Sequence, residues 1–368
     1  MGIKNSGTQY GVSFYDRGGR NHLFDLDDAV NLSYGRQRDA ISAATVNLNV
    51  TQQLAQSKYL QLLEPGRHEM VIWREGVRVW EGPIIGPLGY TSSALQIAAQ
   101  DVSYYLYRTV LHQAYSAAYP NIMNVTDYCG NIIQTELMRK EALDPAINVA
   151  QWMFVHNSAG EARTSSTNDA YSTTVWNVLD NAAANLGIDY TVIGRAIHLW
   201  DTSVSLMGQT AQATQADFQG DLTVSVYGSQ LSTKSFITDG QGNFGQSTDI
   251  DPALAAYYGE WETIANPYDQ DATTAPTQAE LNSQAERNQA GRVPTPAVVR
   301  VPDNGAINLG GAFSFEDLVP GVWVPLLATT TIREFNQWQK IDNIGVSVDD
   351  NGEKITMTLS ATSGQVNA

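Results

Sequence analysis

The sequence has almost no cysteine and no long apolar segment. Cys129 is the only cysteine among 368 residues, so the chain can form neither an intrachain disulfide nor a thiolate metal cluster. No apolar run approaches the length that crosses a bilayer, and the first residues lack the basic and then apolar pattern of an export signal. We therefore expect a protein that folds where it is synthesised and does not insert into a membrane.

Basic side chains are also scarce. The chain has 21 Lys and Arg against 38 Asp and Glu, which gives a formal net charge of −17. The imbalance is strongest in residues 201–290, which contain twelve acidic and two basic side chains. Such a surface repels nucleic-acid phosphates and anionic lipids. We therefore expect no sequence-specific nucleic-acid binding, although a channel with acidic walls would let DNA pass without adhering.

The usual sequence signatures of catalysis are absent. The chain contains no G-x-S-x-G elbow, no P-loop and no H-E-x-x-H segment. The five histidines are far apart, and no two of them have metal-ligand spacing: His22, His68, His112, His156 and His198. We predict a non-enzyme with no catalytic residues, no cofactor and no metal site.

One glycine-rich segment matches a nucleotide-binding pattern by its letters alone. Residues 240–245 read G-x-G-x-x-G, but a dinucleotide site needs a helix that begins at the third glycine. The next residues are a poor helix start and reach Pro252 soon, so a flexible loop is the better interpretation. Asp239 could begin a calcium loop, yet Gln241 replaces a ligand and Ile250 stands where the twelfth-position Glu belongs.

Several carboxylates and the cysteine have a plain structural interpretation beside a functional one. Glu260 and Glu262 flank Trp261 on an expected strand, so both would point to one side, as glycosidase carboxylates do. An exposed acidic face is the favoured interpretation. Cys129 lies among apolar residues and is expected to be a buried small hydrophobe. The eight Trp and seventeen Tyr could form a sugar platform, but such residues more often fill cores and subunit contacts.

One pattern is present twice. Leu-Glu-Pro-Gly at residues 63–66 and Leu-Val-Pro-Gly at 318–321 each open a run of alternating apolar residues. The first run, 70–80, contains Glu75-Gly76 and predicts a β-hairpin, and a second hairpin is predicted over 344–360 around Asn351-Gly352. We interpret these as two related β modules near the two ends of the chain.

The rest of the chain divides into strands and a helical part. Strands are predicted at 43–50, 94–98, 222–226 and through 296–359, and a hairpin at 188–199 turns at Gly194-Arg195. Helices are predicted from Thr126 to about Lys140, from a cap at Ser172 or Thr173 to Gly187, and at 277–290, where we expect a solvated helix. The composition changes near Tyr119-Pro120, and residues 363–368 look like a frayed tail.

Together these segments resemble a minor tail protein of long-tailed actinobacterial phages, of the tail-tip or baseplate-hub type. The similarity is carried by the hairpin Val-Ile-Trp-Arg-Glu-Gly-Val-Arg-Val-Trp-Glu-Gly-Pro-Ile at 71–84, by 176–180 with 187–190, by Tyr258-Gly259, and by 317–321. The resemblance extends to the hub that sits on the cell-puncturing spike of contractile tails.

The resemblance implies a mainly β fold with an α+β insertion. It consists of two similar β-barrel domains of tail-tube type at residues 1–115 and 217–368, the second with a helical insertion at about 250–292. A smaller α/β domain would occupy 116–216. Two related barrels in each of three subunits would form a pseudo-sixfold ring, which closes the sixfold tail tube and adapts it to threefold tip components around a channel for genome ejection.

The same resemblance implies the partners and the location. The partners are two further copies, the distal tail or tail-tube ring protein, the tape measure protein, downstream tip, fibre or spike proteins, and DNA in transit. The location is the tail tip of the virion, assembled in the bacterial cytoplasm. Two alternatives remain: a cell-wall-degrading hydrolase that uses Glu260 and Glu262, and a receptor protein that binds glycans. The chain carries no appended lysozyme or peptidase domain, which disfavours the first alternative.

Overall fold

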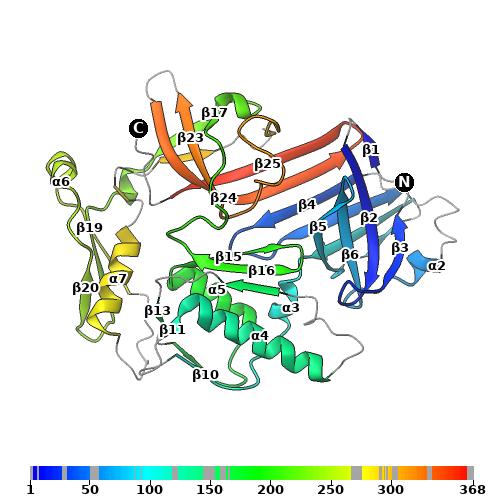
Figure 1. The fold of residues 1–368 in the computed structure, drawn as a ribbon, viewed down its shortest axis with the longest axis horizontal. Helices are drawn as coiled ribbons and strands as arrows, with labels where there is room; N and C mark the ends of the chain where they lie inside the picture. The colour runs from blue at the N-terminus through cyan, green and yellow to red at the C-terminus, as the bar shows by residue number, and fades with distance from the viewer. Residues whose placement is uncertain are drawn as a thin grey trace.

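Two large twisted sheets, an α/β layer and a smaller sheet with its own helix form most of the structure, a computed structural model (Figure 1). It describes residues 3–5, 8–26, 31–49, 58–86, 88–91, 93–117, 123–143, 154–157, 163–164, 166–266, 276–289, 292–293, 295, 297–300, 306–329 and 334–362. The composition change near Tyr119-Pro120 and the predicted tail at 363–368 lie outside these residues.

The first sheet is antiparallel and comes from the N-terminal part of the chain. Its strands are β1 (Ile3–Asn5), β2 (Thr8–Asp16), β3 (His22–Leu26), β6 (His68–Arg74) and β7 (Val77–Pro83). The predicted hairpin is β6–β7. Its turn residues Glu75 and Gly76 have φ values of 48° and 76°, as a tight two-residue hairpin turn requires. Tyr10, Val12 and Phe14 alternate toward the core, so period two in the sequence sets the buried face.

The second sheet combines strands from both ends of the chain. Its members are β17 (Ala213–Thr214), β23 (Trp323–Thr329), β24 (Glu334–Asp349), β25 (Gly352–Ala361), β4 (Asn31–Gln37), β5 (Ala43–Asn49), β9 (Ala94–Gln100) and β8 (Gly89–Tyr90). The long strand β24 pairs with β23 and then with β4 along one edge, and with β25 along the other. Figure 1 shows the orange and red C-terminal strands beside the blue N-terminal ones.

A single apolar core joins these two sheets. It contains Phe14 and Ile72 from the first sheet, Val46 from β5, and Val324 and Ile344 from the C-terminal strands, all fully or almost fully buried. No sheet closes on itself among the described residues. The mainly β fold is therefore confirmed, whereas the two barrels and the domain boundaries stay predictions.

The middle of the chain forms an α/β layer with its own core. Its parts are α3 (Tyr104–Tyr107), β10 (Tyr115–Ser116), β11 (Met123–Asn124), α4 (Val125–Leu143), β12 (Phe154–Asn157), β13 (Arg163–Thr164), β14 (Thr167–Asn168), α5 (Val175–Asn185), β15 (Ile188–Ile193) and β16 (Ala196–Asp201). In Figure 1, β15 and β16 lie between the large sheet and the helices α4 and α5. Both predicted helices are present, and the cap of α5 is Thr174, whose side chain accepts a bond from Asn177 N–H.

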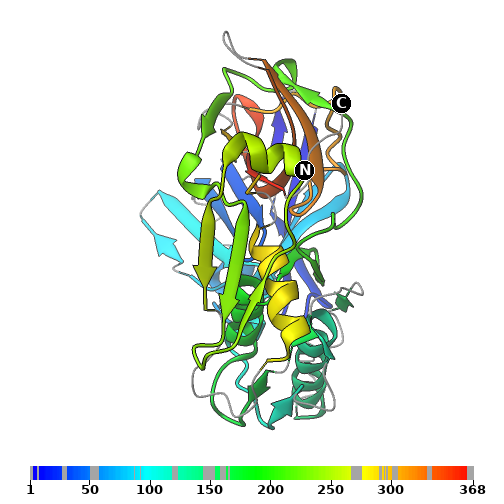
Figure 2. The same ribbon diagram turned by 90° about the vertical axis from the view of Figure 1, so that its left-hand side faces the viewer.

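Most of the remaining elements lie between β17 and β23 in the chain. They are η3 (Gln215–Asp217), β18 (Thr223–Val226), η4 (Gly228–Gln230), β19 (Lys234–Thr238), β20 (Phe244–Gln246), α6 (Pro252–Tyr258), β21 (Glu262–Ala265), α7 (Gln278–Gln289) and β22 (Ala297–Arg300); the short helix α2 (Lys58–Gln61) precedes β6. Figure 2 shows the β19 sheet facing the viewer, with α7 beside it. No helix in the described part of the chain is long and apolar enough to cross a membrane.

The helix predicted at 277–290 is present as α7, but one side of it is buried, not solvated. Leu281 and Ala285 pack with Ile237 of β19 in a small core. At Gly245 of β20 a side chain would overlap the backbone of Leu281, so glycine lets the helix lie directly on the sheet. The mostly polar composition of the segment conceals this narrow apolar stripe.

Candidate assembly and binding sites

Two Pro-Gly turns of the same construction begin the hairpins β6–β7 and β23–β24. The turns span residues 64–67 and 319–322, and in each the N–H of the fourth residue donates to the carbonyl of the first at 3.2 Å. Gly66 and Gly321 have φ values of 79° and 91°. Proline followed by a residue of positive φ is the pattern of a type II turn. The repeated Pro-Gly therefore has one structural meaning at both places.

Each of the two glycines also donates a hydrogen bond to an isoleucine carbonyl on the opposite side of its hairpin. Gly66 N–H donates to Ile84 O at 2.7 Å, and Gly321 N–H donates to Ile341 O at 2.8 Å. Each isoleucine N–H donates a bond back to the first strand. Ile84 N–H donates to His68 O at 2.9 Å, two residues after Gly66, and Ile341 N–H donates to Val322 O at 3.1 Å, one residue after Gly321. The two hairpins thus begin with the same type of turn and the same glycine-to-isoleucine bond, but their strands pair one residue out of step.

A buried arginine joins the α/β layer to the first sheet. Arg195, in the predicted turn between β15 and β16, places Nη1 2.6 Å from Glu69 Oε2 and 3.3 Å from Glu81 Oε2. Tyr105 O–H donates to Glu69 Oε1 at 2.5 Å. All four residues are buried. Burial raises the pKa of the Glu81 carboxyl although Arg195 opposes this change. The contact holds the two layers together through one cation.

A second charged cluster joins three parts of the fold. Asp189 of β15 accepts from Arg38 Nη1 at 2.8 Å and from Lys340 Nζ of β24 at 2.7 Å. Arg38 follows β4 and also pairs with Asp39 at 2.9 Å and Asp342 at 2.7 Å. Three carboxylates thus share two cations. Burial, and then the charge of Asp189, raise the pKa of Asp39 to about 7.

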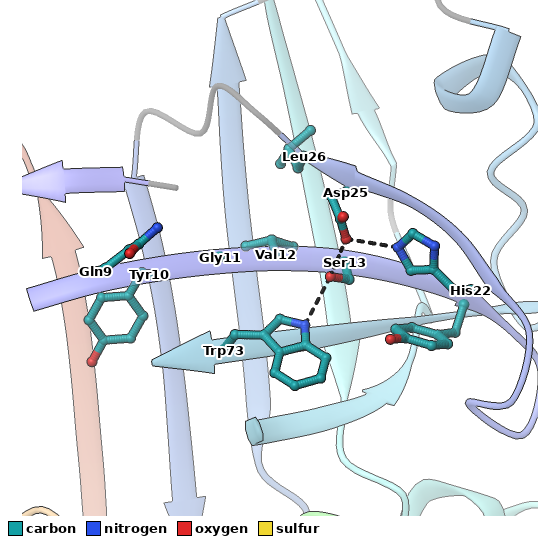
Figure 3. Close-up of a pocket in the computed structure, with 10 residues that line it drawn as sticks. Gln9, Tyr10, Gly11, Val12, Ser13, His22, Asp25, Leu26 and Trp73 are labelled. Atoms are coloured by element: carbon teal, nitrogen blue, oxygen red, sulfur yellow. Dashed lines mark hydrogen bonds and ion pairs between the residues drawn. The ribbon is translucent and has the colours of Figure 1, made fainter. Parts of the chain in front are cut away.

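A hollow of 370 Å³ lies on the outer face of β2 and β6, beside β3 (Figure 3). Ser13 Oγ donates to Asp25 Oδ1 at 2.6 Å, His22 Nε2 lies 2.8 Å from the same oxygen, and Trp73 Nε1 donates to Ser13 Oγ at 2.9 Å. A nucleophilic triad needs histidine between serine and carboxylate. Here Asp25 lies between Ser13 and His22, so the arrangement does not activate Ser13. The hollow instead presents polar groups and the Trp73 ring to a ligand.

The carboxylates singled out in the sequence lie on an exposed surface. Glu262 begins β21, whereas Glu260 precedes the strand, so the expected strand through both residues is shorter than predicted. Both side chains are exposed. Trp261 between them is 53 % exposed, and its indole N–H donates to Tyr258 O at 2.8 Å. This placement agrees with an exposed acidic face.

The Asp239 carboxylate accepts hydrogen bonds from within the glycine-rich loop. Asp239 Oδ1 accepts from the N–H groups of Gln241 at 2.8 Å and Asn243 at 3.1 Å, and Oδ2 accepts from Asn243 Nδ2 at 2.6 Å. These bonds, the Asn243 side chain first, keep the Asp239 pKa below its usual value. Gly245 lies in β20 and not at a helix start, so the segment lacks the helix that a dinucleotide site requires.

Histidines separated in the sequence meet in one place. The rings of His156 and His198 stack with centroids 5.0 Å apart, because β12 and β16 pair in parallel. Burial, and then His156, lower the pKa of His198 to about 4. Within the described residues, no three His, Cys, Asp or Glu gather around a possible metal position. Cys129 is buried, which raises the pKa of its thiol to about 12.

The arrangement of these elements is found in solved structures of phage tail proteins. The 43 kDa tail protein of prophage MuSo2 from Shewanella oneidensis matches with a TM-score of 0.57 and 14 % identity, over 96 % of this chain and 98 % of that one. Prophage tail protein gp18 from Listeria monocytogenes matches with a TM-score of 0.61 and 11 % identity, over 95 % and 94 % of the two chains. The chain has the fold of phage tail proteins.

The tail-protein fold extends to secretion machinery. The E. coli c3393 protein, a component of the type VI secretion system described as similar to the T4 tail proteins gp27 and gp5, matches with a TM-score of 0.50 and 10 % identity, over 96 % of this chain and 79 % of that one. No family model and no curated protein matches the sequence. The expected similarity to tail-tip and hub proteins is thus confirmed at the level of fold.

Proposed function

We propose that this chain is a structural minor tail protein at the tail tip of a long-tailed phage, without catalytic activity. The observation that carries the proposal is the fold match to two prophage tail proteins over 94 to 98 % of their lengths. The same two matches cover 95 to 96 % of this chain.

In the proposed role three copies form a ring that closes the sixfold tail tube and adapts it to threefold tip components. The matching Pro-Gly hairpins at the two ends of the chain support this, since two similar modules in each of three subunits provide six similar positions. The excess of acidic residues in 201–290 supports an acidic channel wall through which DNA passes during ejection.

The proposed partners are the tail-tube ring protein, the tape measure protein, and tip, fibre or spike proteins. A similar protein is described in a PdpA–VgrG complex, and it matches with a TM-score of 0.53 over all of this chain and 67 % of that one. That complex supports partner proteins in general. The proposed location is the virion tail tip, after assembly in the host cytoplasm.

Copy number in purified virions tests the role. Quantitative mass spectrometry of intact particles is expected to give three copies of this chain per particle, against a multiple of six for the tube protein. Absence of the chain from washed virions would refute the proposal. The hydrolase alternative is tested separately with Glu260→Gln and Glu262→Gln, which we expect to leave any wall-degrading activity of the particles unchanged.

A second candidate, glycan binding, is favoured by one observation. The hollow in Figure 3 combines the Trp73 indole with the half-exposed Asp25 and His22 side chains, a combination of apolar ring and hydrogen-bonding groups that suits a sugar. A glycan array with the full-length protein tests it. Binding that Trp73→Ala removes would support it, and an array without signal would remove it.

A further inference from the structure

The outer face of the β19–β20–β21 sheet is apolar and exposed. The strand register puts Phe236 beside Ile264, with Phe244 one row further, on the side opposite α7. Phe244 and Ile264 are 57 % and 69 % exposed, and the rings of Phe236 and Phe244 lie 6.4 Å apart. In Figure 1, α7 lies between this sheet and the rest of the molecule, so the face points outward. Exposed apolar patches with a polar rim mark interaction sites.

The rim of this face is acidic. Glu260 and Glu262 are exposed, and Lys234 on the same face is paired with Asp249 at 3.0 Å. The adjoining helix α6 has no buried residue, although a helix of seven residues has little stability of its own in water. We call this surface the acidic face and define it by Phe236, Phe244, Ile264, Glu260 and Glu262.

A cluster of basic side chains lies where α3 and α4 end. Lys140 Nζ donates to Arg108 O at 3.2 Å and to Thr109 Oγ1 at 2.5 Å. Burial, and then the charges of Arg17 and Arg139, lower the pKa of Lys140 to about 8. Arg108 acts in the same direction, and Glu136, which opposes it, is bound to Arg139 at 2.7 Å. Among the described residues, Arg17, Arg108 and Arg139 thus lie around Lys140 together with one buried carboxylate, Glu136.

Exposed aromatic and aliphatic side chains accompany the basic cluster. Tyr107, Val110 and Tyr171 are 44 %, 40 % and 69 % exposed. Tyr171 has a φ of 60°, a conformation that such a residue rarely adopts, and its ring lies against His112 with centroids 5.2 Å apart. The strained loop thus holds an aromatic ring at the surface. We call this surface the basic face and define it by Tyr107, Val110, Tyr171, Arg108, Arg139 and Lys140.

We propose that the acidic face of one copy of this chain docks against the basic face of the next copy. The two faces are opposite in charge, and each has exposed apolar groups beside its charges. In Figure 1, the β19–β20 sheet lies at the left, α7 lies to its right, and α3 and α4 lie further to the right. The two faces therefore belong to different sides of the molecule. A contact between unlike surfaces repeats head to tail and can close into a ring. The inference rests on the trimeric ring of the proposed function and assigns its contact surfaces.

A second copy explains both faces better than a nucleic acid does. Phosphates would be attracted to Arg108 and Lys140 but repelled by the acidic rim, and the apolar centre of the acidic face would stay uncovered. Complementary charges in a protein contact set the orientation and the partner, which a ring of identical subunits requires.

Charge reversal of each face tests the contact. We expect the wild-type full chain to form trimers in native mass spectrometry and sedimentation, with dissociation as salt rises from about 0.05 to 1 M. Arg108→Glu with Lys140→Glu, or Glu260→Lys with Glu262→Lys, is expected to weaken trimer formation by more than about tenfold. The variant with all four substitutions inverts both faces and is expected to form trimers again.

A mixture of the two double variants provides a further check. Each variant can contact the other on both sides, but in a ring of three one contact must join two like-charged faces. The mixture is therefore expected to give pairs and longer assemblies in which the variants alternate, and no closed trimers. Asp221→Lys with Glu316→Lys has the same charge change on exposed residues outside both faces and should leave the trimer intact. If Lys140→Glu unfolds beside Glu136, as circular dichroism would reveal, Arg108→Glu alone replaces it, because that side chain is exposed.

Two results would overturn the proposed contact. One is a trimer that survives reversal of either face, or a fourfold variant that stays monomeric. The other is a wild-type chain that stays monomeric up to about 0.1 mM. Neither result decides the tail-tip role, which depends on the independent measurement of copy number in virions.

Discussion

Asp39 and Tyr190 exchange two hydrogen bonds where the end of β4 meets β15. Asp39 N–H donates to Tyr190 O at 2.9 Å, and Tyr190 N–H donates to Asp39 Oδ1 at 2.8 Å. Asp39 has a φ of 56°, which Asp and Asn tolerate better than other non-glycine residues. One carboxylate therefore acts both as a partner for the main chain of the α/β layer and as a member of the charged cluster around Asp189.

Asp39→Asn is expected to change how stability depends on pH. The pKa of Asp39 is raised from 3.8 to about 7, so between these values the folded state holds a proton that the unfolded state lacks. The contribution of Asp39 to stability is therefore complete below about pH 4 and is lost as pH rises through about 7. Asparagine keeps an acceptor for Tyr190 N–H and cannot ionise. Urea unfolding should show little difference from wild type at pH 4 and a more stable variant at pH 8, whereas parallel pH curves would contradict this argument.

Replacing Arg195 by methionine should strongly destabilise the fold. Met fills part of the same volume but leaves Glu69 and Glu81, both buried, without their shared cation. Removal of one partner from a buried ion pair typically costs about 3–5 kcal/mol. Chemical unfolding at neutral pH measures the loss.

Arg67→Met is the matched control for Arg195→Met. Arg67 pairs with Asp16 at 3.6 Å, but its side chain is 59 % exposed, so the loss should stay below about 1 kcal/mol. Equal effects of the two substitutions would show that the buried cluster contributes no more than a surface pair.

Cys129 should be unreactive in the folded protein. Its thiol is buried, and burial raises its pKa to about 12, so almost no thiolate is present at pH 8. An alkylating reagent at pH 8 is expected to modify the chain only after denaturation, as intact mass would show. Rapid modification under native conditions would mean that the core around α4 opens readily.

Local patterns in the sequence predict most of the individual elements. The hairpins β6–β7 and β24–β25, the helices α4 and α5, and the hairpin β15–β16 depend on alternation, turn residues and caps within short segments. Short-range sequence patterns are therefore sufficient to distinguish these helices from these strands. The duplicated Pro-Gly also has a structural meaning, because both copies form the same type of turn.

The contacts that join these elements could not be predicted in the same way. The pairing of β24 with β4 links segments about three hundred residues apart, and no pattern within either strand indicates which strand it pairs with. His156 and His198 meet only through the parallel pairing of β12 with β16. Arg195 follows a glycine in a hairpin turn, where exposed arginines are common. Glu69 and Glu81 gave a partial signal of a buried cation, because each stands beside apolar residues of the predicted hairpin. Both are buried in the structure.

Gly66→Ala and Gly321→Ala form a matched pair, because both glycines hold the same turn position with positive φ. Alanine in that conformation costs about 1–2 kcal/mol at either site. At Gly66 nothing lies within 4 Å of the added methyl group, so this cost should be the whole effect. At Gly321 the methyl group would overlap the ring of Trp200, which is fully buried, and overpacking adds to the strain.

We therefore expect Gly321→Ala to lose about 2–5 kcal/mol in total and Gly66→Ala to lose the smaller amount. Thermal unfolding followed by circular dichroism compares the two variants with wild type. Because Trp200 belongs to the α/β layer and Gly321 to the C-terminal module, a larger effect at Gly321 would demonstrate that the two are packed tightly together. Equal losses would mean that this contact yields easily and that only the turn conformation matters.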